Sequence, residues 1–292
     1  MARLRVKAWG ATDAGRRRSR NEDAFGIIEQ DGVLVVADGM GGHRGGSVAS
    51  RMAVDTVVST FRKAHGDYEG ALRREQDDRA RFGTTEPMRT ITTPMEAEDT
   101  PAVPEPDSVS AFPYSSALAL LRLAARQAAA EIYATSRADP ELSGMGTTLT
   151  AAVLEGHRLY VAHAGDSRCY LWREGVLRQL TDDHSWIAEQ VRAGAISEKE
   201  AKQSRFRHVI TRSIGFERHA DLEVRSAELV TGDRLLLCSD GLYGLVSDDD
   251  LTEALRGEPA ELPARLIAMA NERGGDDNIT AVVALLSVSG SG

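Results

Sequence analysis

The chain has 292 residues, of which 42% are hydrophobic and 27% are charged, so it is long enough to bury a substantial core. Its 44 acidic and 35 basic residues give a net charge of −9, which disfavours nucleic acid or an anionic membrane as the main partner. The two cysteines have no metal-type spacing and make no disulfide framework, so we expect reduced thiols in a cytoplasmic protein.

The N-terminal half is expected to contain three strands, two helices and an insertion. Apolar runs predict strands at residues 5–11, 25–29 and 32–37, with an arginine-rich loop after the first. Apolar stripes at helical spacing predict helices at 47–64 and 114–134. Between the helices, about 79–112, proline, threonine and acidic residues predict a low-complexity surface insertion. This is either a solvated loop or a regulatory or docking segment.

Strands dominate from Gly146 onward. Turn residues join four of them, at 147–154, 158–164, 168–173 and 176–180, which predicts an antiparallel meander. Short helical segments at 185–193 and 197–204 follow. The remaining pattern predicts strands at 222–229, 233–239 and 280–288 and helices at 248–256 and 259–273. No internal repeat or second domain is evident. No apolar run approaches the ~20 residues of a membrane helix, and the N-terminus lacks the apolar core of a signal peptide, so we expect no membrane segment in this chain.

Acidic residues stand at the ends of three apolar runs. Asp38-Gly39 ends the first and Asp240-Gly241 the second, while Asp277 lies just before the third. Burial of an unpaired carboxylate is unfavourable, so bound cations are the natural compensation. Oxygen-rich clusters of this kind suit hard divalent ions such as Mg²⁺ or Mn²⁺. The alternative for each aspartate is turn formation, because Asp-Gly is a common turn dipeptide.

Six short motifs occur along the chain in a fixed order. They are Arg-Asn-Glu-Asp (20–23), Asp-Gly-Met-Gly-Gly-His (38–43), Gly-Thr-Thr (146–148), Gly-Asp-Ser-Arg (165–168), Ser-Asp-Gly (239–241) and Asp-Asp-Asn-Ile-Thr (276–280). Together they resemble the metal-dependent type-2C (PPM) protein serine/threonine phosphatases in their compact bacterial form. The resemblance implies an α+β fold: an α/β/β/α four-layer sandwich of two antiparallel sheets flanked by antiparallel helix pairs. It implies that residues 1–292 form a single phosphatase catalytic domain, with a flap beside the site at about 185–215.

The resemblance also implies two core ions, Mn²⁺ or Mg²⁺. Asp38 would bridge them, the Gly39 carbonyl would bind one, and Asp240 and Asp277 would bind the other. Asp276 is a second carboxylate beside this last ligand, and the alignment of Asp-Asn-Ile-Thr favours Asp277.

Four further residues receive roles around the ions. Asp23 would hold coordinated waters, with Glu22 beside it. A third, looser ion would be bound by Asp166 together with Asp240; the alternative for Asp166 is a turn cap that pairs with Arg168. Asn278 would either hydrogen-bond a metal-bound water or brace the Asp277 loop.

Arg18 and His43 complete the expected site. The planar fork of an arginine suits phosphate, and the family's register favours Arg18 over its arginine neighbours, against the alternative of a solvated basic loop. His43 would protonate the leaving oxygen, since its near-neutral pKa suits this work; the alternative is a solvent-facing histidine. We expect the other histidines to be structural or at the surface, and Gly146-Thr147-Thr148 to serve strand packing.

The implied reaction is hydrolysis of phosphoserine and phosphothreonine by direct attack of a metal-bridging water, with no covalent intermediate. The expected partners are phosphorylated proteins, among them serine/threonine kinases and their substrates, and the chain is expected to be a monomer. One alternative is a catalytically silent phosphatase-fold module that binds or regulates, which the retained Asp38, Asp240 and Asp277 disfavour. Another is a hydrolase of small phosphate esters or a phosphatase of a sigma-factor circuit.

Overall fold

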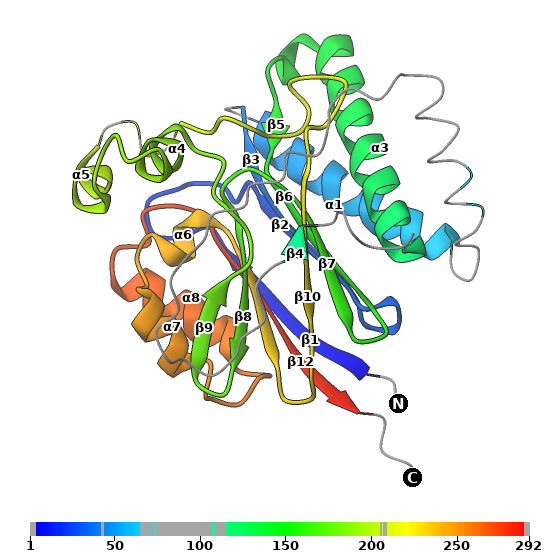
Figure 1. The fold of residues 1–292 in the computed structure, drawn as a ribbon. Helices are drawn as coiled ribbons and strands as arrows, with labels where there is room; N and C mark the ends of the chain where they lie inside the picture. Colours follow the sequence, from blue (N-terminus) through cyan, green and yellow to red (C-terminus); the bar gives the residue numbers. More distant parts are fainter. Residues whose placement is uncertain are drawn as a thin grey trace.

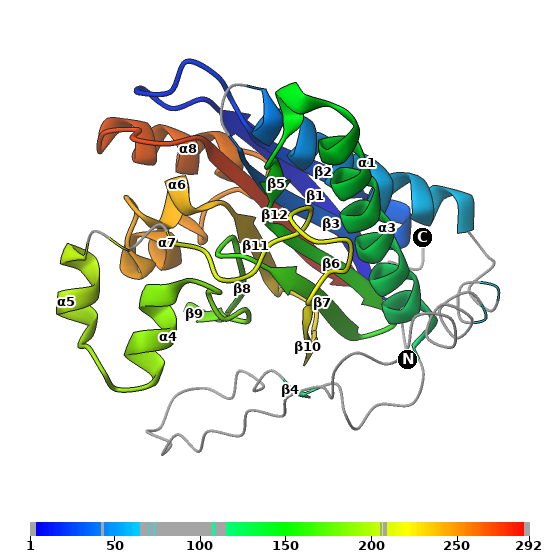
Figure 2. The same ribbon diagram turned by 90° about the horizontal axis from the view of Figure 1, so that it is seen from above.

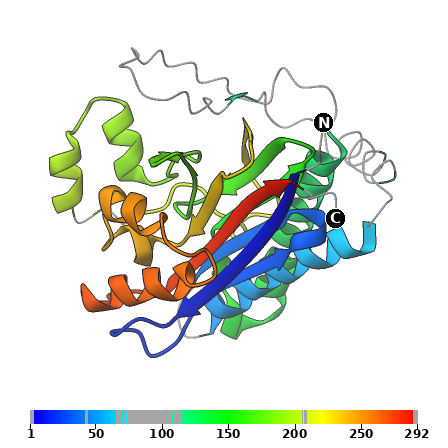
Figure 3. The same cartoon turned by 90° about the horizontal axis from the view of Figure 1, so that it is seen from below.

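The computed structural model describes residues 4–41, 44–64, 115–204 and 209–288, together with 70, 73, 107–108 and 206. Within these residues the strands form two antiparallel sheets that pack face to face, with helices on both outer sides (Figure 1). Figures 2 and 3 show the same order of layers from above and from below. The predicted α+β four-layer sandwich is therefore confirmed.

The first sheet has five strands in the order β1-β12-β11-β8-β9. They are β1 (Leu4–Asp13), β8 (Arg168–Arg173), β9 (Val176–Gln179), β11 (Arg234–Cys238) and β12 (Ile279–Val288). The strands nearest the two ends of the chain pair along their whole length, from Leu4 opposite Val288 to Asp13 opposite Ile279. The start of β12, and with it the Asp277 motif, therefore lies beside the loop that follows β1.

The second sheet follows the order β2-β3-β6-β7-β10-β4, with β5 paired to β3. Its strands are β2 (Asp23–Ile28), β3 (Val33–Met40), β4 (Asp107–Ser108), β5 (Gly146–Thr147), β6 (Leu149–Glu155), β7 (Arg158–Ala164) and β10 (Glu223–Glu228). The 3-10 turn η1 (Glu29–Asp31) joins β2 to β3 and ends at Gly32, which has a φ of 63°. This positive φ is readily adopted by glycine.

The helices cover the outer faces of the sandwich. Helices α1 (Gly45–Ala64) and α3 (Ser116–Ala138) lie on the second sheet, and α6 (Asp240–Tyr243), α7 (Asp248–Ala254) and α8 (Leu262–Glu272) lie on the first. Two further helices, α4 (Trp186–Arg192) and α5 (Glu198–Gln203), stand apart from the sandwich (Figures 1 and 2). Ser115 caps α3, since its Oγ accepts the Leu118 N–H at 3.0 Å. A 3-10 turn, η3 (Pro140–Leu142), follows α3. No helix in the described ranges is long and apolar enough to cross a bilayer.

Strand β3 explains how the layers hold together. Its apolar run is buried on both faces: Val33 and Val35 point toward α1 and α3, while Leu34 and Val36 point into the space between the sheets. This follows from the two-residue period of a strand. A third cluster lies between the first sheet and the helices α6 to α8. Three apolar layers therefore separate four structural layers, and the polar residues of the motifs are left at the strand ends.

The structure corrects one prediction. Residues 147–180 do not form a single meander, because β6 and β7 belong to the second sheet whereas β8 and β9 belong to the first. The change of sheet occurs at Gly165, which has a φ of 117°. The expected insertion at about 79–112 lies outside the described residues, apart from the two residues of β4.

Candidate metal centre

Asp38 stands at the centre of the predicted site, in the last part of β3. Its backbone is held by the Gly-Thr-Thr motif: the Asp38 N–H donates to Thr148 Oγ1 at 2.9 Å, and the Asp38 carbonyl accepts the Thr148 N–H at 2.8 Å and the Thr147 hydroxyl at 2.8 Å. Desolvation and then the charges of Asp23 and Asp240 raise the pKa of Asp38 well above its usual range, although part of its surface still reaches solvent.

Asp23 lies directly opposite Asp38 in the β2–β3 ladder. It is buried, and its Oδ2 accepts hydrogen bonds from Ser239 Oγ and Thr280 Oγ1, both at 2.7 Å. Burial raises the pKa of Asp23 to about 7, although the two hydroxyls oppose this shift. Its other oxygen, Oδ1, is buried with no hydrogen-bond partner among the described residues. An orphaned carboxylate oxygen beside Asp38 fits a position that a cation or its waters would satisfy.

Two further predicted ligands come from the first sheet. Asp240 begins α6 directly after β11, and Asp277 precedes β12, which pairs with β11. The charges of both aspartates contribute to the raised pKa of Asp38, so the structure brings all four acids to one end of the sandwich. Asp276 differs from its neighbour: its side chain is 57% exposed and pairs with Arg17 at 2.8 Å. The structure thus separates a surface aspartate from one that belongs to the cluster.

Asp166 follows Gly165 at the turn between the two sheets and is 5% exposed. Burial raises its pKa well above the usual range, and the charge of Asp240 adds to the shift. Among the described residues no ion pair joins Asp166 to Arg168, although the backbone of Asp166 itself and the charge of Arg168 both oppose the rise in the pKa of Asp166. Arg168 instead binds both carboxylate oxygens of Asp183, at 2.8 and 2.7 Å.

Arg168 also supports the turn through an aromatic ring. Its guanidinium lies 3.6 Å from the centre of the Tyr243 ring, and the Tyr243 hydroxyl donates to the Asp166 carbonyl at 2.9 Å. The pairing with Asp183 could not be found from spacing alone, since the partner is fifteen residues away in a segment that carries none of the six motifs.

Arg18 lies in the loop after β1, where the Arg18 Nη2 donates to Asp277 Oδ2 at 2.8 Å. Hydrogen bonding to this carboxylate raises the pKa of Arg18. The predicted phosphate anchor is therefore adjacent to a predicted metal ligand. Its side chain remains 57% exposed, which leaves it accessible to a ligand from solvent.

Asn278 binds the backbone of this arginine loop with both ends of its amide. The amide oxygen accepts the Glu22 N–H at 2.8 Å, and the amide nitrogen donates to the carbonyls of Ala14 at 3.0 Å and Arg20 at 2.8 Å. Its own N–H donates to Asp277 Oδ1 at 2.9 Å. Of the two roles that the sequence left open for Asn278, these contacts favour bracing the loop over binding a metal-bound water.

Glu22 and Gly39 meet at the start of α1. The Gly39 N–H donates to the Glu22 carbonyl at 3.1 Å, and a Cβ at Gly39 would collide with the Gly46 carbonyl. Burial raises the pKa of the Glu22 carboxyl, while the charge of Arg18 opposes the shift. His43 lies outside the described residues.

The acids supply the oxygen donors that hard cations bind, but their side chains are not arranged as a complete coordination site. In the described ranges, no three carboxylate, imidazole or thiolate groups already stand in position to hold one ion. Ionised carboxylates repel one another, and Arg18 occupies one oxygen of Asp277. A cluster of buried acids with raised pKa values nevertheless has the charge and the oxygen donors that divalent ions require.

Sequence reasoning missed the hydroxyls that surround the acids. Thr148 holds the Asp38 backbone, and Ser239 and Thr280 hold Asp23. The signal was present, because each hydroxyl belongs to one of the six motifs. A buried hydroxyl that neighbours a buried acid is an expected donor.

Comparison with known proteins agrees with this geometry. The Protein phosphatase 2C family profile matches residues 12–282. The serine/threonine phosphatase stp of Listeria monocytogenes is 32% identical over 277 residues, which cover 93% of this chain and 92% of that protein. The crystal structure of PstP/Ppp, a Mycobacterium tuberculosis serine/threonine phosphatase, has a TM-score of 0.75 at 33% identity and covers 97% of this chain and 99% of its own.

A second solved structure bears on the metals. It holds the catalytic domain of the serine/threonine phosphatase PstP in complex with two manganese ions, with a TM-score of 0.70 at 34% identity over 97% of this chain and 99% of that one. Six ordered motifs, a shared sandwich and matches over nearly the whole length lead to one conclusion. The chain belongs to the protein phosphatase 2C family of serine/threonine phosphatases.

Proposed function

We propose that this chain hydrolyses phosphoserine and phosphothreonine in proteins at a centre that holds two divalent ions, Mn²⁺ or Mg²⁺. The observation that carries the proposal is a group of buried acids whose pKa values are raised first by burial and then by the charges of their acidic neighbours. Such a group is unfavourable without cations and favourable with them. The two manganese ions of the PstP catalytic domain support the same number of ions.

The placement of the acids supports the ligand assignment that the family motifs imply. Asp38 is the proposed bridge, the Gly39 carbonyl serves one ion, and Asp240 and Asp277 serve the other. Asp23 holds coordinated water through the oxygen that has no hydrogen-bond partner in the described part of the chain. Asp166, with Asp240, is the proposed site of a third ion, supported by its burial and by the effect of the Asp240 charge on its pKa.

Bound divalent ions would lower the pKa of a coordinated water and offset the charge of the phosphate. The chain supplies the remaining functions. Arg18 binds phosphate oxygens with its guanidinium, of which the structure commits one nitrogen to Asp277. His43 is the proposed donor of a proton to the leaving oxygen of serine or threonine. Thr148 and Asn278 keep the Asp38 strand and the Arg18 loop in place.

We further propose that residues 1–292 act as one catalytic domain and as a cytoplasmic monomer. The buried, unpaired thiols of Cys169 and Cys238 are compatible with a reducing setting. The proposed partners are phosphorylated proteins, among them serine/threonine kinases and their substrates.

The test uses two neighbouring aspartates as a matched pair. Hydrolysis of a phosphothreonine peptide by the purified chain is measured with Mn²⁺, with Mg²⁺ and with excess EDTA. We expect turnover that EDTA abolishes, that Asp277→Ala lowers by roughly a hundredfold or more, and that Asp276→Ala leaves nearly unchanged, because only the first aspartate belongs to the acid cluster. No turnover by folded protein with either metal would favour a binding module. Equal losses in both variants would contradict the ligand assignment.

A further inference from the structure

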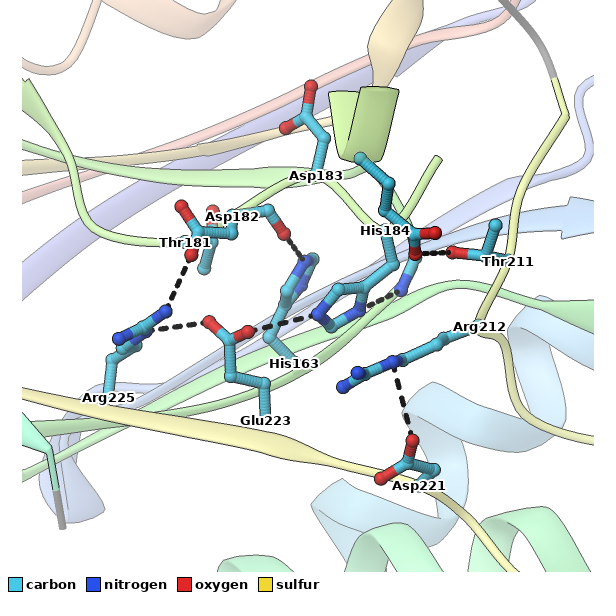
Figure 4. A network of polar contacts seen from close by, with 12 residues as sticks. His163, Thr181, Asp182, Asp183, His184, Thr211, Arg212, Asp221, Glu223 and Arg225 are labelled. Carbon is cyan, nitrogen blue, oxygen red and sulfur yellow. Dashed lines mark hydrogen bonds and ion pairs between the residues drawn. The ribbon is translucent and has the colours of Figure 1, made fainter. Parts of the chain in front are cut away.

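Two buried histidines, His163 and His184, lie close together and take no part in the proposed mechanism (Figure 4). His163 is the penultimate residue of β7, and His184 follows β9. Their ring centres are 4.7 Å apart, and neither side chain is appreciably exposed. Burial and the neighbouring imidazole lower the pKa of His163 to about 4, so that its ring is neutral at pH 7, with Nε2 donating to the Asp182 carbonyl at 3.0 Å.

His184 binds both backbone groups of Gly165, the residue before Asp166. The Gly165 N–H donates to His184 Nδ1 at 3.2 Å, and the Gly165 carbonyl accepts the His184 N–H at 2.8 Å. On its other side Gly165 is confined by Thr148, whose side chain would lie 2.6 Å from an added Cβ. Contacts with these two residues therefore hold the Gly165 backbone, and the hydrogen bond from the Tyr243 hydroxyl to the Asp166 carbonyl supports the next residue of the turn.

The hydrogen bonds around His184 define where its proton must be. Because Nδ1 accepts the Gly165 N–H, the proton of the neutral ring resides on Nε2, which donates to Glu223 Oε2 at 3.1 Å. Glu223 is itself held by Arg225, whose Nε donates to Oε1 at 2.6 Å, and Arg225 Nη2 donates to Asp182 Oδ2 at 2.6 Å (Figure 4). Burial opposes the charge of Glu223, but hydrogen bonding to His184 and the charge of Arg225 outweigh it and lower its pKa to about 2.

His184 also joins the turn to the described residues of the flap at about 185–215. Its carbonyl accepts the Thr211 N–H at 2.8 Å, and the Trp186 N–H donates to the Val209 carbonyl at 2.8 Å, so the two ends of the flap pair beside the histidine. Farther on, Ile214 exchanges two backbone hydrogen bonds with Thr147, at 3.0 and 2.9 Å. Thr147 in turn donates to the Asp38 carbonyl.

We propose that His184, with its proton held on Nε2 by Glu223, is a positioning residue that sets the Gly165–Asp166 turn for catalysis and fixes the flap to it. It acts through the Gly165 backbone and touches neither substrate nor ion. The proposal rests on the proposed assignment of Asp166 to the metal centre.

Substitution of His184 by asparagine or by glutamine separates the two hydrogen bonds of the ring, one to Gly165 and one to Glu223. The Oδ1 of asparagine lies near the place of Nδ1 and can accept the Gly165 N–H, whereas the Nε2 of glutamine lies near the place of the histidine Nε2 and can reach Glu223. The proposal assigns the greater weight to the Gly165 contact. His184→Asn is therefore expected to act like the unaltered chain, and His184→Gln is expected to act like His184→Ala.

The first measurement is amide hydrogen exchange at Gly165, by NMR, in the metal-free protein. We expect about tenfold faster exchange in His184→Gln and His184→Ala, and a change of less than about threefold in His184→Asn. Because no metal or substrate is present, this result is independent of whether the chain is a phosphatase. Equal exchange in the Asn and Gln variants would overturn the assignment.

The second measurement links the contact to the reaction. The Mn²⁺ concentration for half-maximal turnover is expected to rise about tenfold in His184→Gln, with a smaller change in KM for the phosphopeptide, and to stay near its original value in His184→Asn. Glu223→Gln, which keeps the shape and removes the charge, should also speed exchange at Gly165. Its control is Glu228→Gln on the same strand, where the side chain is 69% exposed. If Glu223→Gln and Glu228→Gln have the same effect on amide exchange at Gly165, Glu223 does not help to position His184.

Discussion

At the scale of single residues, the burial of Asp38 and the acids around it favour cation binding, and the same two features destabilise the fold when no cation is bound. Its pKa is raised in the folded chain by desolvation and by neighbouring aspartates. A carboxyl with a raised folded-state pKa binds protons more tightly when folded than when unfolded. The ionised group therefore destabilises the metal-free fold at neutral pH, and this destabilisation is removed as the pH falls through the raised pKa.

We expect Asp38→Asn to separate binding from stability. The metal-free variant should have a higher Tm than the unaltered chain, because one charge is removed from a repelling cluster. Its turnover should fall roughly a hundredfold or more. Calorimetry without metal and a phosphopeptide assay with Mn²⁺ measure the two effects. As a control, Asp31→Asn changes a buried aspartate in the distant turn η1 and should not raise Tm. A lower Tm in Asp38→Asn would contradict the repulsion argument.

His163 predicts a pH dependence of stability with the opposite sign. Its folded-state pKa of about 4 lies below the unfolded value near 6.5, mainly because of burial. The unfolded chain therefore binds more protons at this residue, and its contribution to the free energy of unfolding declines as the pH falls from about 6.5 to 4. The full shift corresponds to about 3 kcal/mol.

Urea unfolding of the metal-free protein at pH 7, 6 and 5 measures this dependence. His163→Gln should lose less stability than the unaltered chain over that interval. His219→Gln, at an exposed position, should follow the unaltered chain. If His163→Gln shows the same slope as the unaltered chain, His163 is not the titrating group.

The sequence identifies acids more readily than their partners. Asp38 and Asp240 are recognisable because a carboxylate directly follows an apolar strand and precedes a glycine. The bond between Arg18 and Asp277 joins positions 259 residues apart, so only the pairing of β1 with β12 brings them together. Likewise, His184 has no local pattern that distinguishes it from a surface histidine, and its role depends on contacts with Gly165 and Glu223.

At the scale of elements, strand positions follow from local periodicity, but the sheet to which a strand belongs does not. The residues between β7 and β8 signal a turn in the sequence, and they are a turn in the structure. Whether the chain returns beside β7 or crosses to the other sheet depends on backbone direction at Gly165, where φ is 117°. This crossover places Asp166 in the connection from one sheet to the other, which a meander would not do.

The requirement for glycine at position 165, where the chain crosses from one sheet to the other, can be tested by substitution. Gly165→Ala forces a side chain into a positive φ and brings its Cβ to 2.6 Å from the Thr148 side chain. Gly156→Ala, between β6 and β7, also has a positive φ, of 66°, but no atom lies within 4 Å of the new Cβ. We expect Gly156→Ala to cost about 1 kcal/mol and Gly165→Ala to cost about 2 kcal/mol more, with a loss of turnover only at Gly165. Chemical unfolding and a phosphopeptide assay test this, and equal costs would show that the clash relaxes.

For the whole molecule, the acid centre lies across the joint between the two sheets. Asp23 and Asp38 come from adjacent strands of one sheet, whereas Asp240 and Asp277 flank strands β11 and β12 of the other. The apolar cluster between the sheets holds this joint from within. Ions bound by acids of both sheets would hold it from the open end, so cation binding and the packing of the sandwich are coupled.

This coupling predicts that Mn²⁺ stabilises the whole fold. A ligand that binds only the folded chain, present at about a hundred times its Kd, adds about 2.7 kcal/mol to the free energy of unfolding. For a chain of this size this corresponds to a rise in Tm on the order of 5 °C. Differential scanning calorimetry with and without Mn²⁺ measures the rise. Asp38→Asn and Asp240→Asn should each remove most of it, although they alter different sheets, whereas Asp276→Asn should retain it. If Asp240→Asn keeps the full rise while Asp38→Asn loses it, the ions bind to one sheet alone and do not join the two.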